Sequence, residues 1–399
     1  MDLLANTVRP YAWGSTTALP ELLGTEPTGE PQAELWMGAH PGAPSRLDRG
    51  TGPVPLNDVI AADPRGELGD AVVDRFGPRL PFLFKVLAAG TALSVQVHPD
   101  LDQAKAGFAD EEARGIPADA PDRTYRDANH KPEMLCALTP FEGLCGFRHP
   151  AEAADLLESL AVDELKPFVD ILRARPESDA LREVLVAVLS AERTAMAETV
   201  ERAALAAARL GEGDGPFADA CAAYAQAAHD FPGDPGVIAA MLLNHVRLQP
   251  GEALYLGAGI PHAYLSGLGV ELMANSDNVL RCGLTPKHID VPELLRVVRF
   301  TPGDPAVRRP EDAGDGEEVY DTPIDEFRLS RYVLAPGAAA HRLAAPAPQI
   351  LLCTAGRATL TDADGTRLTL ERGRSAYAPA GEPLTLDGEG TVFRATVKV

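Results

Sequence analysis

One short pattern occurs twice in the chain, and it constrains the fold more than any other feature. Residues 248–262 (LQPGEALYLGAGIPH) and 370–384 (LERGRSAYAPAGEPL) carry the same residue at four landmark positions. These are the first Leu, the Gly three residues later, a second Gly eight residues after that, and the Pro next to the end. In both copies apolar runs alternate with Gly or Pro turns, which predicts strand, turn, strand, tight turn and strand. The repeat predicts two related β domains, of which the first copy ends in His262 and the second in Leu384.

The Gly-x5-Pro-x-Gly spacing of the second copy resembles the second half of a cupin motif, which forms a small β-barrel of the jelly-roll class. Short β-type runs such as 80–87 and 93–98 fill the amino-terminal part of the chain. The region 150–235 instead places apolar residues at i, i+3 and i+4, which predicts amphipathic helices. The predicted fold class is mainly β with an α-helical insert: two cupin (jelly-roll type) β-barrel domains plus a helical domain.

Changes in composition predict the domain boundaries. We expect a discontinuous first barrel (1–149 and 236–300), a helical insert (150–235), a linker rich in Pro, Gly and Asp (301–319) and a cupin-like C-terminal domain (320–399). The last domain contains one histidine, His341, and carries Leu384 where the first copy has His262. We therefore expect the C-terminal domain to bind no metal.

Charge and composition exclude several classes of protein. The 399 residues carry 36 Lys+Arg against 58 Asp+Glu, a formal net charge of −22, and no basic run, which argues against a nucleic-acid partner or a polybasic membrane surface. No apolar stretch approaches the ~18 residues of a membrane span, and the first residues lack a signal-peptide pattern. Five scattered cysteines without CxxC spacing predict reduced thiols. We expect a soluble cytoplasmic protein.

The first barrel offers four potential metal ligands. Gln96 and His98 stand two residues apart on a predicted strand, so their side chains point to one face. Glu133 and His262 lie on other strands or strand ends. Two imidazoles, one carboxylate and one amide oxygen suit Zn²⁺ or another divalent first-row ion.

Two polar segments surround these candidates. Residues 125–133 (YRDANHKPE) hold six ionisable side chains, and Pro132 keeps Lys131 extended, so that Lys131 and Glu133 share a face. Residues 262–287 place His, Tyr, Glu, Asp, Arg and Lys among apolar neighbours, which predicts a polar cavity because these groups need partners. In the chain as a whole lysine is rare, since only six of the 36 basic residues are lysine.

These two segments resemble the two signature motifs of type I phosphomannose isomerases (mannose-6-phosphate isomerases), zinc-dependent enzymes of the cupin class. The resemblance extends over most of the chain, because further matches lie at residues 11–15, 33–38 and 93–99. One departure is Cys282, where the family usually has alanine; we expect this small-for-small change to be tolerated.

The resemblance implies a role for each matching residue. One Zn²⁺ per chain is expected on Gln96, His98, Glu133 and His262. The catalytic group comprises Arg281, Lys131, Glu271 and Asp277. The substrate, a hexose 6-phosphate, is expected to contact Ser94, Lys287, Lys85, His130 and Tyr264, of which Ser94 and Lys287 match residues assigned to the phosphate.

The implied reaction interconverts mannose 6-phosphate and fructose 6-phosphate through a cis-enediol or enediolate. It needs a base for the C2 proton and positive charge near the substrate oxygens, which Arg281 and Lys131 can provide. Asp277 precedes Arg281 by four residues, so the two pair if that stretch is helical. The sequence leaves the base open among Glu271, Asp277, His98 and Lys131.

Two other classes of function stay open at this point. One is a sugar-phosphate-binding bicupin without catalysis, which would bind substrate without turnover. The other is an Fe²⁺ cupin oxidoreductase, which would consume O₂ with its substrate. Beyond the small-molecule substrate we expect no nucleic-acid or membrane partner, and a monomer, with weak homo-oligomerisation as the alternative. Substrate breadth and the roles of the helical insert and second barrel are not predicted.

Overall fold

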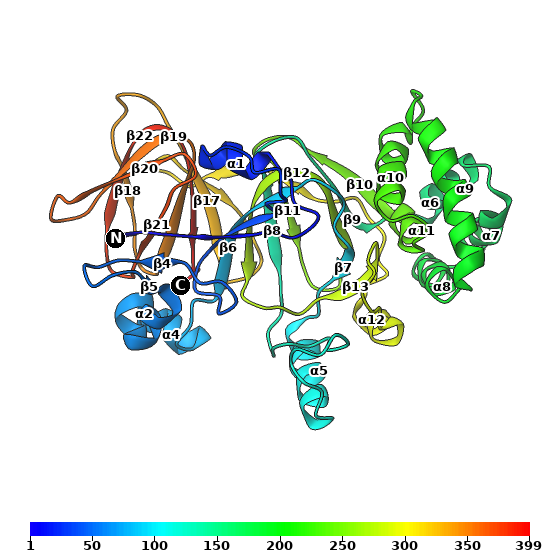
Figure 1. The fold of residues 1–399 in the computed structure, drawn as a ribbon, viewed down its shortest axis with the longest axis horizontal. Coiled ribbons are helices and arrows are strands. Elements are labelled where there is room, and N and C mark those ends of the chain that lie inside the picture. Colours follow the sequence, from blue (N-terminus) through cyan, green and yellow to red (C-terminus); the bar gives the residue numbers. More distant parts are fainter.

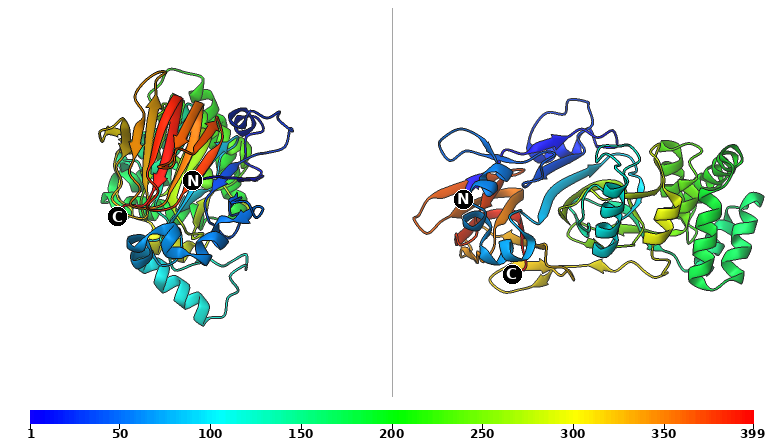
Figure 2. Two further views of the ribbon diagram at one scale, coloured as in Figure 1. Left: turned by 90° about the vertical axis from the view of Figure 1, so that its left-hand side faces the viewer. Right: turned by 90° about the horizontal axis from the view of Figure 1, so that it is seen from below.

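The computed structural model describes residues 1–399 apart from the side chain of Arg193. Its elements are arranged along one long axis, with a C-terminal β lobe at one end, a larger sheet in the middle and a helical block at the other end (Figure 1). A perpendicular view keeps the same order (Figure 2). The chain is thus mainly β, with one block of helices at one end of the molecule.

The central sheet forms the larger β layer. Its main path runs β14 (Val307–Arg308), β11 (Ala253–Leu256), β8 (Glu133–Ala137), β12 (His262–Ala274), β6 (Phe82–Ala89), β3 (Glu34–Met37) and β2 (Thr7–Arg9). Four strands branch from it: β7 (Val95–Val97), β9 (Phe141–Phe147), β10 (Leu243–Leu248) and β13 (Leu280–Gly283). Pairing is antiparallel, so strands distant in sequence meet side by side.

The second sheet is built mostly from the last part of the chain. Its path is β1 (Asp2–Leu3), β21 (Ser375–Ala378), β19 (Gln349–Thr361), β22 (Leu384–Thr396), β17 (Arg328–Leu334), β16 (Glu317–Tyr320) and β15 (Glu311–Asp312). Strands β18 (His341–Leu343) and β20 (Arg367–Glu371) pair with β22 and β19. The amino terminus therefore belongs to this sheet, and β4 (Arg46–Leu47) with β5 (Val54–Pro55) forms a small separate one.

The sequence repeat corresponds to a repeat of structure. Strands β11 and β21 start at 253 and 375, an offset of 375 − 253 = 122, and β12 and β22 start at 262 and 384, an offset of 384 − 262 = 122. The ends of both pairs keep this offset, at 256 and 378 and at 274 and 396. His262 and Leu384 thus open equivalent long strands.

The helical block occupies the region where amphipathic periodicity predicts helices. It comprises α6 (Pro150–Ser159), the 3-10 turn η1 (Asp163–Leu165), α7 (Lys166–Ala174), α8 (Glu177–Leu189), α9 (Arg193–Gly211), α10 (Ala218–Asp230) and α11 (Gly236–Met241). The periodic stretch 181–200 is divided between α8 and α9. Glu192 marks the break, because its carboxylate accepts hydrogen bonds from the amides of Thr194 and Ala195 and so caps α9.

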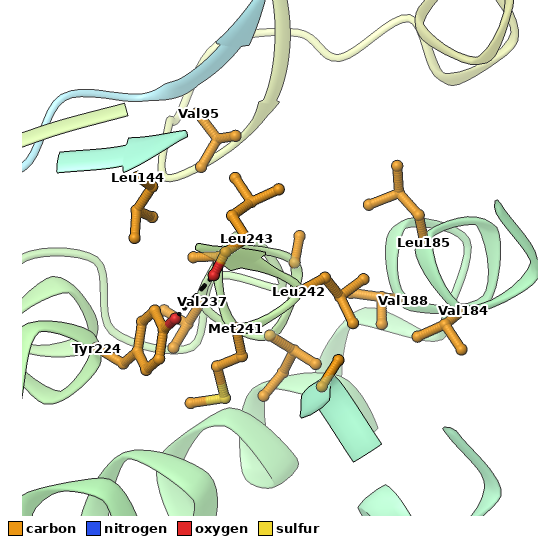
Figure 3. Packing of buried hydrophobic residues seen from close by; sticks show 14 of the residues in the cluster. Val95, Leu144, Val184, Leu185, Val188, Tyr224, Val237, Met241, Leu242 and Leu243 are labelled. Carbon is orange, nitrogen blue, oxygen red and sulfur yellow. Dashed lines mark hydrogen bonds between the residues drawn. The ribbon is translucent and has the colours of Figure 1, made fainter. Parts of the chain in front are cut away.

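The helices share a hydrophobic core with the adjoining strands. Figure 3 shows Val237 and Met241 of α11, and Leu242 directly after it, packed between Tyr224 of α10 and Val184 of α8. Val95, Leu144 and Leu243 from β7, β9 and β10 belong to the same core. The block is therefore fixed to the edge of the sheet that carries β7 and β13.

Tyr224 supplies a polar anchor in this core, and its removal gives a stability prediction. Its buried hydroxyl donates to the Leu243 carbonyl at 3.1 Å and accepts from the Arg148 guanidinium at 3.1 Å. Tyr224→Phe should lower the free energy of unfolding by about 1–3 kcal/mol, because both partners lose a hydrogen bond inside the core. Urea unfolding measures this, with Tyr11→Phe as a partly exposed control; a loss below about 0.5 kcal/mol, the range of surface changes, contradicts the anchor.

Some elements, most of them short, differ from the sequence expectations. The amino-terminal β region also contains α1 (Ala18–Leu23), α2 (Leu56–Ala62), α3 (Pro64–Leu68) and α4 (Asp70–Phe76), and α5 (Leu101–Ala113) and α12 (Val291–Val297) lie farther along. The stretch expected as a linker carries β14, β15 and part of β16. Helices of one or two turns and two-residue strands are too short to produce a periodic pattern, so they depend on tertiary contacts.

The two sheets are joined by apolar packing. Phe82 and Val270 of the central sheet share one buried cluster with Ile350 and Phe393 of the second sheet. At this interface the Tyr320 hydroxyl donates to the Gly251 carbonyl at 2.9 Å. Among the described residues, no helix has the length and apolar character that crossing a bilayer requires.

Candidate metal centre

Three buried side chains from three parts of the central sheet converge on one point. His98 follows β7, Glu133 opens β8 and His262 opens β12. The Nε2 atoms of both histidines lie 3.4 Å from the same Glu133 oxygen, Oε2. One ligand atom from each residue falls within 4.8 Å of the others, which is the arrangement of a divalent-metal site.

The protonation of the two histidines supports this interpretation. Nδ1 of His98 lies 2.9 Å from the Asn278 carbonyl, and Nδ1 of His262 lies 2.9 Å from the Ile260 carbonyl. A carbonyl oxygen only accepts, so each Nδ1 carries a proton, and Nε2 of the neutral ring presents a lone pair. Burial lowers the pKa of His98 to about 4, which keeps its ring neutral at pH 7.

The Nε2 atoms consequently have no hydrogen-bond partner among the described residues. Two lone pairs facing one carboxylate oxygen repel it unless a cation lies between them. Burial alone would raise the pKa of Glu133, but the Lys131 ammonium, 3.2 Å from Oε1, helps to hold that pKa well below its usual range. Two imidazoles and a carboxylate are a donor set that fits Zn²⁺, with backbone carbonyls orienting both rings.

The strand register brings two more predicted residues to this cluster. On one side Gln96 of β7 pairs with His262, and on the other it pairs with Arg281 of β13. Residues directly opposite one another in antiparallel strands point to the same face. The amide of Gln96 therefore shares a face with His262 and Arg281.

A second buried network lies on β3, β6 and β12. Lys85 of β6 pairs in register with Trp36 and Glu271. Its Nζ lies 2.9 Å from Glu271 and 3.4 Å from Glu34, while the Tyr264 hydroxyl donates to Glu271 at 2.9 Å. Burial alone would lower the pKa of Lys85, but the two carboxylates outweigh it and raise that pKa, so the ammonium stays charged. Burial also raises the pKa of Glu271.

A backbone irregularity lets one strand serve both networks. The pairing of β12 with β9 shifts register between Tyr264 and Ser266, and Gly267 follows with φ 120°. A Cβ at Gly267 would lie 2.7 Å from the Phe141 ring, so the bend requires glycine. The bulge changes the side-chain alternation, which allows Tyr264 to reach Glu271 on the same strand.

Asp277 lies at the rim of the cluster. The stretch 275–279 is a loop and Arg281 lies on β13, so the helix that would pair Asp277 with Arg281 is absent from the described chain. Asp277 instead faces His40, 3.3 Å from its Nε2, and this contact lowers the pKa of the carboxyl. The pairing of Asp277 with Arg281 was expected only if the stretch was helical. Because its backbone is a loop followed by a strand, the two side chains do not pair in the described structure.

Arg281 and Lys287 form a group of cations with Arg126. Burial lowers the pKa of Arg281 and of Lys287, and the positive charge of Arg126 adds to both shifts. Within the described residues neither Arg281 nor Lys287 has a carboxylate partner. Ser94 immediately precedes Val95, which pairs with Gly283 two residues beyond Arg281. In a chain of net charge −22, such a group is an anion-binding arrangement.

Comparison with known proteins identifies the family. Residues 1–150 match the family model "Phosphomannose isomerase type I, catalytic domain". Over 406 residues, the chain is 41% identical to the mannose-6-phosphate isomerase of Escherichia coli, and the match covers 100% of both chains. The chain belongs to the mannose-6-phosphate isomerase family.

Solved structures of the family agree in fold. A crystal structure of a phosphomannose isomerase variant from Salmonella typhimurium matches with a TM-score of 0.90 and 41% identity, covering 100% of both chains. A crystal structure described as mannose 6-phosphate isomerase (holo; zinc bound) matches with a TM-score of 0.90 and 40% identity, covering 100% of this chain and 99% of that one. This family member therefore shares its fold with a protein that binds zinc.

Sequence analysis did not select several residues of the site. Asn278 is the most connected: its Oδ1 accepts from the amides of Arg126 and Asp127, its Nδ2 donates to the carbonyls of Asp127 and Asn129, and its own carbonyl holds His98. Glu34, His40 and Glu326 also contact predicted site residues. An asparagine among apolar residues in 262–287 was a signal for Asn278, whereas the others depend on tertiary contacts.

The cysteines, Cys282 among them, give a prediction on thiol reactivity. All five cysteines are buried and free in the described structure. Burial raises the pKa of the Cys282 and Cys145 thiols to about 12 and that of Cys136 and Cys353 to about 11, and it also raises the pKa of Cys221. Because the thiolate is the reactive form, a disulfide reagent at pH 8 should label none in the native protein and five after denaturation. Rapid labelling of one native thiol would contradict this.

Proposed function

We propose that this protein is a zinc-dependent aldose–ketose isomerase that interconverts D-mannose 6-phosphate and D-fructose 6-phosphate. The observation that carries the proposal is the pair of unpartnered Nε2 atoms facing Glu133, in a chain 41% identical over its full length to a mannose-6-phosphate isomerase. In the reaction a proton leaves C2 and is returned to C1 through a cis-enediol or enediolate. The hydroxyl proton moves from O2 to O1 as the carbonyl moves from C1 to C2, so atoms and electrons balance without a redox partner.

We assign one zinc ion per chain to His98, Glu133 and His262, with Gln96 as the fourth ligand. The geometry of the first three and the register of Gln96 opposite His262 support this assignment. When bound, zinc supplies a Lewis acid that polarises a substrate oxygen and offsets the buried charge of Glu133.

The cations near the cluster receive the negative charges of the substrate. Arg281 lies opposite Gln96 on the same face, so we assign to it, with Lys131, the stabilisation of charge that develops on the enediolate oxygens. Lys287 and Ser94 are assigned to the phosphate, because they belong to the group of unpaired cations and to the adjoining strand end. The guanidinium of arginine stays protonated throughout, so the charge of Arg281 does not depend on proton transfer.

The base is assigned to one of two carboxylates, Glu271 or Asp277. His98 is excluded because Nδ1 donates to a carbonyl and Nε2 is assigned to the metal. Lys131 and Lys85 are held as ammonium partners of Glu133 and of Glu271. Burial raises the pKa of Glu271, which makes its carboxylate the stronger proton acceptor, whereas Asp277 is the more accessible of the two.

We further propose the domain boundaries of the fold, the cellular compartment of the enzyme and its oligomeric state. The matched offsets of β11 with β21 and of β12 with β22 support two cupin barrels, with boundaries at 1–149 and 236–300 for the first, 150–235 for the helical insert, 301–319 for the connection and 320–399 for the second. The first barrel holds the metal, and Leu384 leaves the second without it.

Five buried free thiols in the described structure support a reducing compartment, the cytoplasm. We propose that a monomer is the active form.

A coupled assay tests the activity. The purified protein, loaded with zinc, is incubated with mannose 6-phosphate, and fructose 6-phosphate is followed through phosphoglucose isomerase and glucose-6-phosphate dehydrogenase. We expect turnover that stops when zinc is chelated. Binding of mannose 6-phosphate without product would indicate a non-catalytic sugar-phosphate protein, and substrate-dependent O₂ uptake would indicate an oxidoreductase; either result overturns the proposal.

A further inference from the structure

A short loop of the second sheet contacts the segment that leads into Glu133. Residues 321–327 connect β16 to β17, and from this loop Glu326 extends to His130, with Oε1 2.5 Å from Nε2. Both side chains are 20% exposed, so the contact is largely shielded from water. The pair joins residues 196 positions apart in sequence.

The loop is fixed on both sides of this contact. Phe327 is fully buried in the cluster shared by the two sheets. The Asp325 carbonyl accepts from the Lys398 amide at 3.1 Å. Burial alone would raise the pKa of Glu326, but the His130 contact outweighs it and lowers that pKa. The carboxylate is therefore charged and held in place.

His130 transmits this restraint toward the metal cluster. It directly precedes Lys131, whose Nζ lies 3.2 Å from Glu133 Oε1. The next residue, Pro132, accepts a hydrogen bond from the Ala274 amide at 3.0 Å, which ties the segment to the end of β12. On the other side of His130, the Asn278 amide donates to the Asn129 carbonyl. The ring of His130 lies between these two hydrogen bonds and is held by Glu326.

We infer that Glu326 is a positioning residue that the second sheet supplies to the active site: it orients His130 and thereby sets the position of the Lys131 ammonium. The inference rests on the proposed isomerase function. It also gives the C-terminal β lobe, which has no metal-ligand cluster among its described residues, a part in the reaction.

Steady-state kinetics of Glu326→Ala, on the zinc-loaded full chain, tests this inference. The loss of a side chain that orients a metal ligand costs about 10- to 100-fold in metal affinity or activity, and we expect the lower end of this range because His130 is not itself a ligand. We expect kcat to fall by about 10-fold, with KM, zinc content and Tm near the wild-type values. Glu326→Gln keeps an acceptor for His130 and should retain more activity than Glu326→Ala.

The matched control is Asp325→Asn on the same loop. It removes the ion pair with Arg75, whose side chains are 45% and 51% exposed, and such surface pairs contribute little. It should leave kcat unchanged. Equal losses in Asp325→Asn and Glu326→Ala would overturn the inference, because they would indicate a general effect of the loop.

A double-mutant comparison tests whether Glu326 acts through His130. If it does, Glu326→Ala combined with His130→Gln should be no slower than His130→Gln alone, within about twofold. Multiplying losses would contradict the inference, as would a wild-type kcat in Glu326→Ala. The proposed function has failed only if the wild-type protein shows no turnover, so the two failures are distinguishable.

Discussion

Replacing His262 with alanine should remove both zinc and turnover. His262 supplies one of the two Nε2 atoms that face Glu133, and its loss leaves the carboxylate with a single imidazole opposite it. A metal Lewis acid contributes several kcal/mol to transition-state stabilisation, and each 1.36 kcal/mol is tenfold in rate, so kcat should fall by at least about 10³-fold. Elemental analysis and the coupled assay measure the two effects.

The control for this variant is His229→Ala, because His229 is exposed on α10. It should keep one zinc per chain and wild-type turnover. If His262→Ala retained stoichiometric zinc, the ligand assignment would be wrong. If it lost zinc but kept its activity, the metal would have no part in the reaction.

Replacing Arg281 with alanine should give a different pattern, in which zinc and fold are kept while kcat falls. Arg281 shares a face with Gln96 but contacts no member of the His98, Glu133 and His262 cluster through an ion pair in the described structure. Removal of one donor that stabilises developing negative charge costs about 10²- to 10³-fold in kcat. Steady-state kinetics with zinc analysis checks this.

The neighbouring variant Cys282→Ala is the matched control. Cys282 follows Arg281 on β13, is buried and should be replaceable by the alanine usual in the family, with turnover within about twofold of wild type and a stability loss of about 1 kcal/mol. A change in Arg281→Ala that is confined to KM would assign Arg281 to substrate binding alone. Loss of zinc in this variant would likewise contradict its assigned role.

Local sequence signals account for much of the fold and for its limits. The repeat at 248–262 and 370–384 predicted strands that the structure places at a constant offset of 122 residues, and the apolar periodicity of 150–235 predicted the helices. The short helices α1 to α4 and the attachment of β1 to β21 were not predicted. Each depends on contacts with residues distant in sequence, which leave no local pattern.

The candidate site likewise combines features with a local sequence pattern and features that depend on distant residues. Lys131 and Glu133 were expected on one face from their spacing, and their side chains meet at 3.2 Å. The cluster of His98, Glu133 and His262 comes from three separate strands, so spacing alone indicated candidates but not their geometry. Partners such as Glu326 were missed because a contact with His130, 196 positions away in the chain, has no signature in the sequence.

The most direct test of the account is a titration of zinc into metal-free protein, with the conversion of mannose 6-phosphate to fructose 6-phosphate as the readout. The account predicts no turnover without metal, a linear rise with added zinc and a plateau at one zinc per chain. Full activity in the metal-free protein, or no activity at one equivalent of bound zinc, would contradict it.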